Sequence, residues 1–377
     1  MTKVCFLFSD LRNSNGVSKA AVAIANLLVK HKNVDVTLIP LYRCENNMTQ
    51  SADNRIKIKK VFGFYFRGFD KIVDLIPHKL LYKWIVKPGA YDIEVGFQYN
   101  MPTKIIAASS NKKAVHLTWI HTYDKGLELR RYYEKMDKVI CVAKYGSDKF
   151  KKEINGKVET DYCYNPVDDK KIVMMGNESI DIKRPEGFLF VSVARHSPEK
   201  GYDRLLKIIS RLKKDGYKFN MWLIGDGPSH KFLMELASNL EINDIVCFLG
   251  NQTNPHKYTA RGDVFVCPSY REGYSTACTE SIILGVPVIT TPVGGGEEII
   301  EASNAGILTN MDDESLYQGL KRVLDDTSIV IKWKENLKET RFHFLEEERS
   351  KKIYDIIEWA TDLHEIKSLN SDNQKQL

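Results

Sequence analysis

The chain has 377 residues, 43% hydrophobic content and a net charge of +6 at neutral pH. That length is enough for two domains of about 150–200 residues each. No apolar run of about 18 residues occurs, which excludes a membrane-spanning helix, and the apolar start is interrupted at Ser9 and Asp10, which argues against a signal peptide. We therefore expect a cytoplasmic, globular protein of two domains.

The seven cysteines are scattered along the chain, and no two of them form a Cys-x-x-Cys pair or a Cys/His ligand spacing. Most of them lie inside apolar runs. This usage predicts reduced core cysteines and no structural metal.

Short apolar strands alternate with amphipathic helices from the N-terminus onward. Residues 3–9 and 35–41 predict buried strands, and residues 18–31 between them predict a helix. This βαβ pattern implies a parallel sheet whose ligand edge lies at the carboxyl ends of the strands. Gly16 stands between the first strand and the helix, where backbone amides can approach an anion. Further first-half strands are predicted at 91–97, 113–121 and 138–143.

Residues 54–91 are basic and rich in aromatic residues, and Asp70 and Asp74 are their only acids. Such a segment suits an anionic membrane surface, with cations on phosphates and rings at the headgroup boundary. A pair of helices whose aromatics pack into a core and whose lysines are solvated explains the pattern equally well. No nucleic-acid-binding motif accompanies the segment, so we do not expect a nucleic acid partner.

The second half repeats the strand and helix pattern, which predicts an α/β fold of two doubly wound units in series. We expect an N-terminal domain at 1–168, a C-terminal domain at 169–350, a helix at 351–366 that returns to the first domain, and a disordered tail at 367–377. The predicted second-half strands are 188–194, 219–225, 245–250, 263–269 and 287–291.

Five second-half motifs occur in a distinctive order, and they are "VARHSPEKGYDRLLKII", "LIGDGP", "FLGNQTN", "VFVCPSYREGYSTACTESIILGVPVITT" and "GGGEEII". In order and spacing they resemble the family 4 glycosyltransferases, which have the GT-B fold of two Rossmann-like domains facing across a cleft. The similarity is to bacterial members that build capsule, lipopolysaccharide or other envelope glycans. It implies an N-terminal domain that binds the acceptor and a C-terminal domain that binds a nucleotide-sugar.

The resemblance assigns the diphosphate of the donor to Arg195 and Lys200, which follow a predicted strand and flank a turn that opens a helix. A guanidinium fork and an ammonium point charge suit a pyrophosphate and can neutralise it without a metal. In the first domain, the resemblance makes Gly16 a donor-binding position. The commoner family form has two adjacent glycines there, whereas this chain has Asn15 in the first position.

Two glutamates eight positions apart carry the most diagnostic part of the resemblance. It implies that Glu280 accepts hydrogen bonds from the ribose hydroxyls and that Glu272 contacts hydroxyls of the donor sugar. The backbone amides of Gly273, Tyr274 and Ser275 are expected to meet the sugar or the phosphate at the start of a helix.

The resemblance also gives His121 a catalytic role, because it ends a first-half strand expected to face the cleft. It further implies front-face attack with retention of anomeric configuration. Asp168 and Asp169 lie in the expected linker, and we predict no metal there and no cofactor.

The expected activity is transfer of a sugar from a nucleotide-sugar, preferably a UDP-sugar, to a saccharide acceptor that is lipid-linked. The protein would then be peripheral on the inner face of the cell membrane or free in the cytoplasm. Two alternatives stay open, a nucleotide-sugar epimerase of the same fold and a noncatalytic nucleotide-sugar-binding subunit of an envelope-assembly complex.

Overall fold

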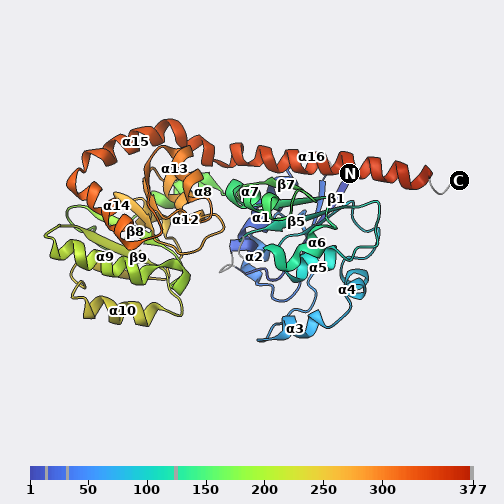
Figure 1. Cartoon of the computed structure of the whole chain (residues 1–377), viewed down its shortest axis with the longest axis horizontal. Helices are drawn as coiled ribbons and strands as arrows, with labels where there is room; N and C mark the ends of the chain where they lie inside the picture. Colours follow the sequence, from blue (N-terminus) through green and yellow to red (C-terminus); the bar gives the residue numbers. More distant parts are fainter. Residues whose placement is uncertain (13–15, 31–33, 123–125, 374–377) are drawn as a thin grey trace. The chain divides into compact units, whose positions relative to one another are not determined.

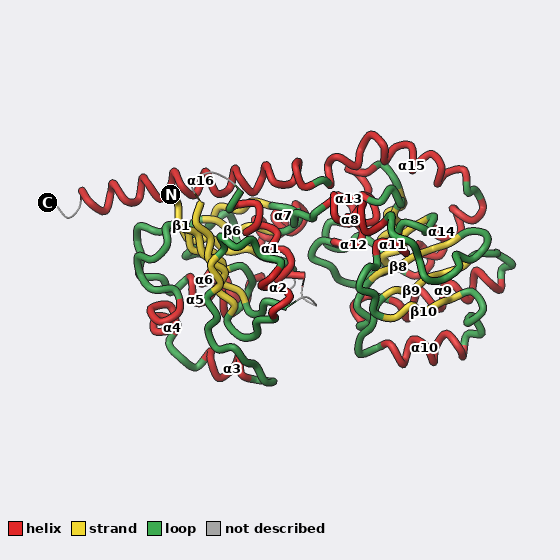
Figure 2. The backbone as a smooth tube through the Cα atoms, turned by 180° about the vertical axis from the view of Figure 1, so that it is seen from behind, coloured by secondary structure: helices red, strands yellow, loops and turns green. Residues whose placement is uncertain are grey.

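The computed structural model describes residues 1–12, 16–30, 34–122 and 126–373. The chain forms two compact units, of which the first contains Met1–Val167 and Arg349–Leu377 and the second contains Asp168–Glu348. Each unit has one parallel sheet with helices around it, as Figure 1 and the strands in Figure 2 show. The predicted α/β class with two doubly wound halves is confirmed.

The first unit contains a seven-stranded sheet in the order β3-β2-β1-β4-β5-β6-β7. Its strands are β1 (Thr2–Phe8), β2 (Val34–Pro40), β3 (Lys57–Ile58), β4 (Ile93–Gly96), β5 (Val115–Ile120), β6 (Lys138–Cys141) and β7 (Glu159–Tyr162). Its helices are α1 (Gly16–Leu28), α2 (Asn46–Gln50), α3 (Phe69–Asp74), α4 (His78–Ile85), α5 (Met101–Ile106), α6 (Arg130–Tyr133), α7 (Lys144–Glu153) and most of α16 (Glu346–Asn373).

The second unit contains a six-stranded sheet in the order β10-β9-β8-β11-β12-β13. Its strands are β8 (Leu189–Val193), β9 (Asn220–Ile224), β10 (Val246–Gly250), β11 (Val264–Cys267), β12 (Val288–Thr290) and β13 (Gly306–Leu308). Its helices are α8 (Asp169–Gly176), α9 (Tyr202–Lys214), α10 (His230–Asn239), α11 (His256–Thr259), α12 (Thr276–Ile283), α13 (Gly296–Ser303), α14 (Asp313–Asp325) and α15 (Ser328–Thr340).

Every strand predicted from an apolar run is present, because strands with both faces covered by helices need continuous apolar sequence. In β1, residues from Val4 to Phe8 are completely buried. The three strands that the sequence did not predict, β3, β7 and β13, lie at the edges of the two sheets. β3 and β13 are very short, and β7 has the polar sequence ETDY, so none of them produces an apolar run.

The segment 54–91 folds as a short strand and two short helices, and its aromatic residues divide between two environments. Tyr82 is fully buried, and Phe62 and Phe69 pack against the core of the first unit. Phe64 and Trp84, by contrast, are more than half exposed. Among the described residues, no helix is long and apolar enough to cross a membrane.

The C-terminal helix α16 packs on the first unit through an apolar stripe of Ile353, Ile356, Ile357 and Ala360, which is buried. The expected end of this helix at residue 366, and the disordered tail from 367, are wrong for residues 367–373, which are helical. The last four residues, 374–377, lie outside the described part of the chain.

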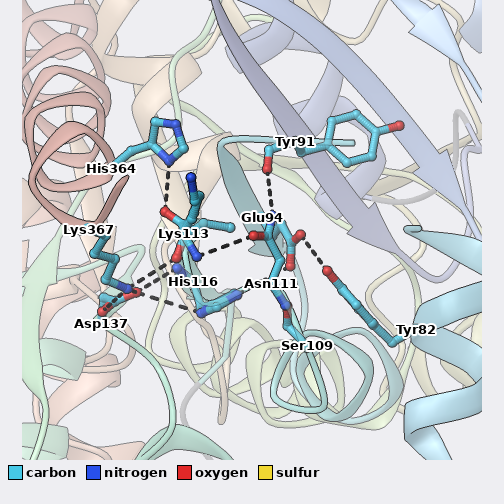
Figure 3. Close-up of polar contacts among 11 residues, drawn as sticks. Tyr82, Tyr91, Glu94, Ser109, Asn111, Lys113, His116, Asp137, His364 and Lys367 are labelled. Atoms are coloured by element: carbon cyan, nitrogen blue, oxygen red, sulfur yellow. Dashed lines mark hydrogen bonds and ion pairs between the residues drawn. The ribbon is translucent and has the colours of Figure 1, made fainter. Parts of the chain in front are cut away.

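Polar contacts to strand ends of the first sheet explain why the helix continues, and Figure 3 shows those of His364 and Lys367. Lys367 Nζ lies 2.7 Å from each carboxylate oxygen of Asp137 and donates to the carbonyl oxygen of Ala114 at 3.1 Å. His364 Nδ1 lies 2.8 Å from the carbonyl oxygen of Lys113, whose Nζ pairs with Asp372 at 2.6 Å. The polar composition of residues 367–377 suggested disorder, because these long-range partners cannot be read from the local sequence.

A buried carboxylate lies in the same region of the sheet and was not anticipated from the sequence. Glu94 of β4 is completely buried, and Tyr82 donates a hydrogen bond from its hydroxyl to Glu94 Oε1 at 2.8 Å (Figure 3). His116 Nε2 lies 3.4 Å from Glu94 Oε2. The hydroxyl of Tyr82 thus satisfies one carboxylate oxygen of Glu94, whereas Oε2 has no hydrogen-bond partner among the described residues and lies beside the His116 ring. Buried polar atoms are normally paired, which makes this an unusual core position for an acid.

We predict that Lys367→Ala loosens the end of α16, because it removes a partly buried, charge-assisted pair of hydrogen bonds. The free energy of local opening of residues 361–373 should fall by about 1–2 kcal/mol, measured by native-state hydrogen exchange. Lys338→Ala is the control, because Lys338 forms an exposed pair with Glu335 on α15, and it should change its own helix by less than about 0.5 kcal/mol. Equal small effects of the two substitutions would contradict the prediction.

Candidate functional site

The second unit has a topological switch point at β8, because β9 lies on one side of this strand and β11 on the other. In open doubly wound sheets the chain segments that leave the carboxyl ends of the strands diverge at such a point, and ligands bind at that edge of the sheet. Arg195 and Lys200 follow β8, and Glu272 follows β11. The structure thus brings the predicted cations and the first predicted glutamate to the same edge.

Lys200 and Glu272 form a direct ion pair, with 2.7 Å between Lys200 Nζ and Glu272 Oε1. Ser269 donates a second hydrogen bond from its hydroxyl to the same carboxylate oxygen at 2.9 Å. Both charged side chains are mostly buried. Burial disfavours the charged form of Lys200, but the attraction and the hydrogen bond of Glu272 outweigh it, so the pKa of Lys200 is raised. The lysine stays charged at neutral pH.

Arg195 lies at the start of the same loop and is exposed. Its guanidinium forms no hydrogen bond or ion pair with the described parts of the chain. An exposed guanidinium at the same sheet edge as the ammonium of Lys200 is available to an anionic ligand.

Helix α12 begins at this edge, and a side chain caps its N-terminus. Ser275 is its N-cap residue and accepts a hydrogen bond from the backbone amide of Cys278 at 3.3 Å. Tyr274 is buried directly before the cap. The capped N-terminus and the neighbouring amide of Gly273 give this end of the helix a positive potential.

Glu280 lies on α12, and its side chain is about one quarter exposed. His256 Nδ1, at the start of α11, lies 3.9 Å from Glu280 Oε2. His256 was not predicted as a site residue, because a single histidine outside any recognised motif does not indicate a binding role.

The glycine cluster after β12 packs against the loop that carries Glu272. Gly294 and Gly295 have φ values of 40° and 80°, in the left-handed region. A Cβ on Gly294 would lie 2.1 Å from the carbonyl oxygen of Glu272, and one on Gly295 would lie 2.4 Å from the ring of Tyr274. Gly294 therefore allows the two loops to meet backbone to backbone, and Gly295 leaves room for the Tyr274 ring.

A pair of stacked histidines lies beside Arg195 and was not anticipated. His196 Nδ1 and His230 Nδ1 are 2.8 Å apart, with ring centroids 4.9 Å apart. Burial, with His230 as a second cause, lowers the pKa of His196 to about 4. With this lowered pKa His196 is neutral at physiological pH, and in the hydrogen bond between the two rings one Nδ1 donates and the other accepts.

The remaining predicted residues belong to the first unit. Gly16 is the first residue of α1, and a Cβ there would meet nothing within 4 Å, so its backbone is open to a ligand. Asn15 lies outside the described residues. His121 follows β5 and packs its ring on Phe97 at 4.7 Å.

His121 is held as a neutral imidazole. Burial lowers its pKa to about 3, although a hydrogen bond with the Phe97 backbone acts in the opposite direction. Its Nε2 atom is buried and has no hydrogen-bond partner within the described ranges. Buried polar atoms are normally paired, so this nitrogen is a candidate for contact with a ligand.

The adjacent acids at the boundary of the second unit have structural partners. Asp168 caps α8 by accepting from the backbone amide of Lys171 at 2.9 Å, and Asp169 accepts from the backbone amide of Glu346 at 2.9 Å. Within residues 1–12, 16–30, 34–122 and 126–373, no three His, Cys, Asp or Glu side chains are grouped so that they could hold a metal ion.

Comparison with known sequences agrees with the predicted family. Residues 178–340 match the family model described as glycosyl transferases group 1. The chain is 30% identical over 177 residues to N-acetylgalactosamine-N,N'-diacetylbacillosaminyl-diphospho-undecaprenol 4-alpha-N-acetylgalactosaminyltransferase of Campylobacter jejuni, covering 46% of this chain and 47% of that protein. It is 28% identical over 151 residues to the lipopolysaccharide core biosynthesis glycosyltransferase LpsD of Rhizobium meliloti, covering 40% and 43%. It thus aligns with slightly less than half the length of these relatives.

Solved structures share the fold over nearly the whole chain. Sucrose-phosphate synthase from Thermosynechococcus elongatus superposes with a TM-score of 0.75 at 15% identity, covering 95% of this chain and 99% of that one. HepE from Anabaena, solved in complex with UDP, superposes with a TM-score of 0.72 at 17% identity, covering 94% and 99%. The predicted GT-B fold is confirmed.

We predict that Gly294→Ala disrupts the site loops, whereas Gly285→Ala is the matched control. Both glycines have positive φ, but a Cβ on Gly285 meets nothing within 4 Å. The control should cost about 1 kcal/mol of backbone strain, and Gly294→Ala should cost at least about 1–3 kcal/mol more because its Cβ overlaps backbone atoms. Urea denaturation measures both. Equal losses of stability in the two variants would show that the close approach of Gly294 to Glu272 does not contribute to the free energy of unfolding.

Proposed function

Because residues 178–340 belong to the group 1 glycosyl transferases, we propose that the protein transfers a sugar from a nucleotide-sugar to a saccharide acceptor in cell-envelope polysaccharide synthesis. The observation that carries the proposal is the Lys200 and Glu272 ion pair at the switch point of the second sheet, beside the exposed guanidinium of Arg195. Fixed cations at the carboxyl edge of a doubly wound sheet suit a nucleotide diphosphate.

The departing diphosphate gains negative charge as the bond to the sugar breaks. Lys200 and Arg195 neutralise that charge together with the amides of Gly273, Tyr274 and Ser275 at the start of α12. No metal is needed, because two side-chain cations and a helix N-terminus supply the positive potential.

The two glutamates act at opposite ends of the donor. When a phosphate draws Lys200 away, Glu272 becomes able to accept hydrogen bonds from sugar hydroxyls. Glu280, on the next turns of α12, accepts from the ribose hydroxyls, since a carboxylate can accept from both at once. We propose uridine as the nucleoside, and the UDP bound to the structurally similar HepE chain supports this choice.

Retention of configuration follows if the acceptor hydroxyl attacks on the face from which the diphosphate leaves. The new glycosidic bond forms as the sugar–phosphate bond breaks, and the hydroxyl proton passes to the leaving phosphate oxygen. His121 and the open backbone at Gly16 are the candidate residues of the first unit, and a neutral imidazole can hydrogen-bond a sugar hydroxyl without adding charge. This role for His121 derives from the family resemblance and from its unpaired, buried Nε2.

We predict that the wild type binds UDP without metal and that Glu280→Ala weakens binding about a hundredfold, since it removes two charged hydrogen bonds of about 1.5–3 kcal/mol each, offset in part by solvent. Isothermal titration calorimetry with UDP, GDP and ADP measures this. Glu301→Ala, on the exposed surface of α13, is the control and should leave binding unchanged.

Two outcomes would oppose the catalytic proposal. A folded wild type that binds none of the three nucleotides would instead favour a noncatalytic subunit. Interconversion of UDP-sugars without any acceptor would favour the epimerase alternative.

The acceptor is proposed to be lipid-linked, with the protein peripheral on an anionic membrane. The observation that favours this is a set of exposed apolar residues close together in the sequence of the first unit. They are called the α3–α4 patch here and are Phe64, Phe66, Ile72, Leu75, Ile76, Leu80 and Trp84. Exposed basic residues accompany it, namely Lys60, Arg67, Lys71, Lys79 and Lys83. Apolar side chains among cations match acyl chains beneath anionic headgroups. The diphospho-undecaprenol in the name of the Campylobacter relative is in keeping with this.

We predict that the protein co-sediments with vesicles containing 30% phosphatidylglycerol and not with pure phosphatidylcholine vesicles. Replacing Leu75 and Trp84 by serine should weaken binding at least tenfold. Replacing Lys60, Lys71, Lys79 and Lys83 by glutamine should do the same, at about 1 kcal/mol for each charge. Lys57 and Lys59 are less suitable targets, because Lys57 pairs with Asp35 and Lys59 donates to the carbonyl oxygen of Ile85.

The matched control replaces Phe232 and Met234 by serine, since these residues are similarly exposed on α10 of the second unit. It should bind vesicles like the wild type. Equal binding by all variants would overturn the membrane proposal. A dimer that disappears only when the patch is altered would show that a second copy covers it.

A further inference from the structure

A buried arginine joins the two loops that carry Lys200 and Glu272. Arg204 lies on α9, one turn after Lys200, and its side chain is only 1% exposed. Its Nε and Nη2 atoms donate to the carbonyl oxygen of Pro268 at 2.9 and 2.5 Å, and Nη2 also donates to that of Ser269 at 3.1 Å. Nη1 donates to the carbonyl oxygen of Met311 at 2.7 Å. The guanidinium fork thus spans from α9 to the loop after β11.

This arginine is compensated by carbonyl dipoles and not by a close carboxylate. Its one ion-pair partner in the described residues is Asp313, at 4.0 Å, and the Asp313 side chain is 60% exposed. Arg211, on the same helix, is by contrast exposed and pairs directly with Glu314. Burying a cation is costly unless its donors are satisfied. Here two of the three donor atoms bind the loop after β11, and the third binds the carbonyl oxygen of Met311.

Three further contacts fasten the same loop to the start of α9. Gly201 has a φ of 69°, and a Cβ there would lie 2.0 Å from the carbonyl oxygen of Pro268. The backbone amide of Tyr270 donates to the carbonyl oxygen of Glu199 at 2.8 Å. The Tyr270 ring also lies 4.1 Å from the guanidinium carbon of Arg204. Residues 268–270 are therefore held at the start of α9 both by close backbone packing and by the guanidinium of Arg204.

We propose that Arg204 is a positioning residue that sets the spacing of Lys200 and Glu272 and so aims Lys200 at the donor diphosphate. It touches neither the substrate nor the reacting atoms. Arg204 acts from α9 on the carbonyl oxygens of Pro268 and Ser269, and the Ser269 hydroxyl in turn holds Glu272. This role rests on the proposed function, because it assumes that Lys200 binds a phosphate.

Arg204→Lys is the informative substitution. A lysine keeps the charge, but its single ammonium cannot reproduce the planar fork that spans two successive carbonyl oxygens. Arg211→Lys is the matched control, with the same chemical change on the same helix at an exposed site. Circular dichroism establishes that both variants fold. If Arg204→Lys does not fold, Tyr270→Leu replaces it, since that change removes the ring beside the guanidinium and leaves the hydrogen bonds of Arg204.

Two measurements separate positioning from general support of the fold. The first is hydrogen exchange of residues 268–275 without nucleotide, which reports the loop itself. The second is calorimetric binding of UDP and of UMP, whose ratio isolates the contribution of the second phosphate. If the wild type prefers guanosine or adenosine nucleotides, the matching diphosphate and monophosphate are used.

We expect Arg204→Lys to accelerate exchange in residues 268–275, to weaken UDP binding at least tenfold and to leave UMP binding within about twofold. Arg211→Lys should change none of these.

Unchanged exchange would overturn the proposal whatever the nucleotide result. If exchange is faster but UDP and UMP binding weaken equally, or neither weakens, Arg204 supports the fold of the loop and does not position Lys200. A wild type that binds no nucleotide would refute the proposed function, and the positioning role with it, although the exchange result would still show whether Arg204 holds the loop.

Discussion

The ion pair between Lys200 and Glu272 depends on a constraint that acts on the whole second unit: β8 and β11 must be neighbours in a parallel sheet. The two residues are 72 positions apart in the chain, yet the carboxyl ends of neighbouring parallel strands meet at one edge. Removing two charges from water is costly, and a 2.7 Å contact recovers that cost only when the surrounding polar groups are also satisfied. The hydroxyl of Ser269 donates to the same carboxylate oxygen of Glu272, and Arg204 satisfies carbonyl oxygens of Pro268 and Ser269 in the loop that carries this glutamate.

The glycines of the second unit follow from the same constraint. Loops that leave β8, β9, β11 and β12 converge at one edge, where a side chain at the wrong position would separate them. Gly225 and Gly227 pack against the loop after β8, because a Cβ on either would lie within 2.4 Å of a carbonyl oxygen of Ala194 or His196. Gly294 does the same against Glu272. The site is therefore built mainly from backbone, and its few charged side chains are set in a rigid frame.

The first unit uses the same architecture with different chemistry. Its candidate residue is a neutral histidine, whereas the second unit presents cations and carboxylates. A shared fold therefore does not give the two sheets a shared role, since function depends on the side chains at the strand ends. Helix α16, which starts in the last residues of the second unit and continues on the first, is held by an apolar stripe and by the charges of Lys367 and Asp137.

The sequence by itself determined the class of fold and most of the strands, because a strand covered on both faces requires a local apolar run. It also identified the glutamates, Arg195 and Lys200 as candidates, since their spacing follows recognisable motifs. Only the tertiary structure decided which residues meet: the Lys200 and Glu272 pair, the stacked histidines, the buried Arg204 and the helical residues 367–373 all depend on partners far away in the chain. Local sequence pattern reports the burial of a segment, whereas an ion pair or a buried fork requires the relative placement of segments, which only the folded chain provides.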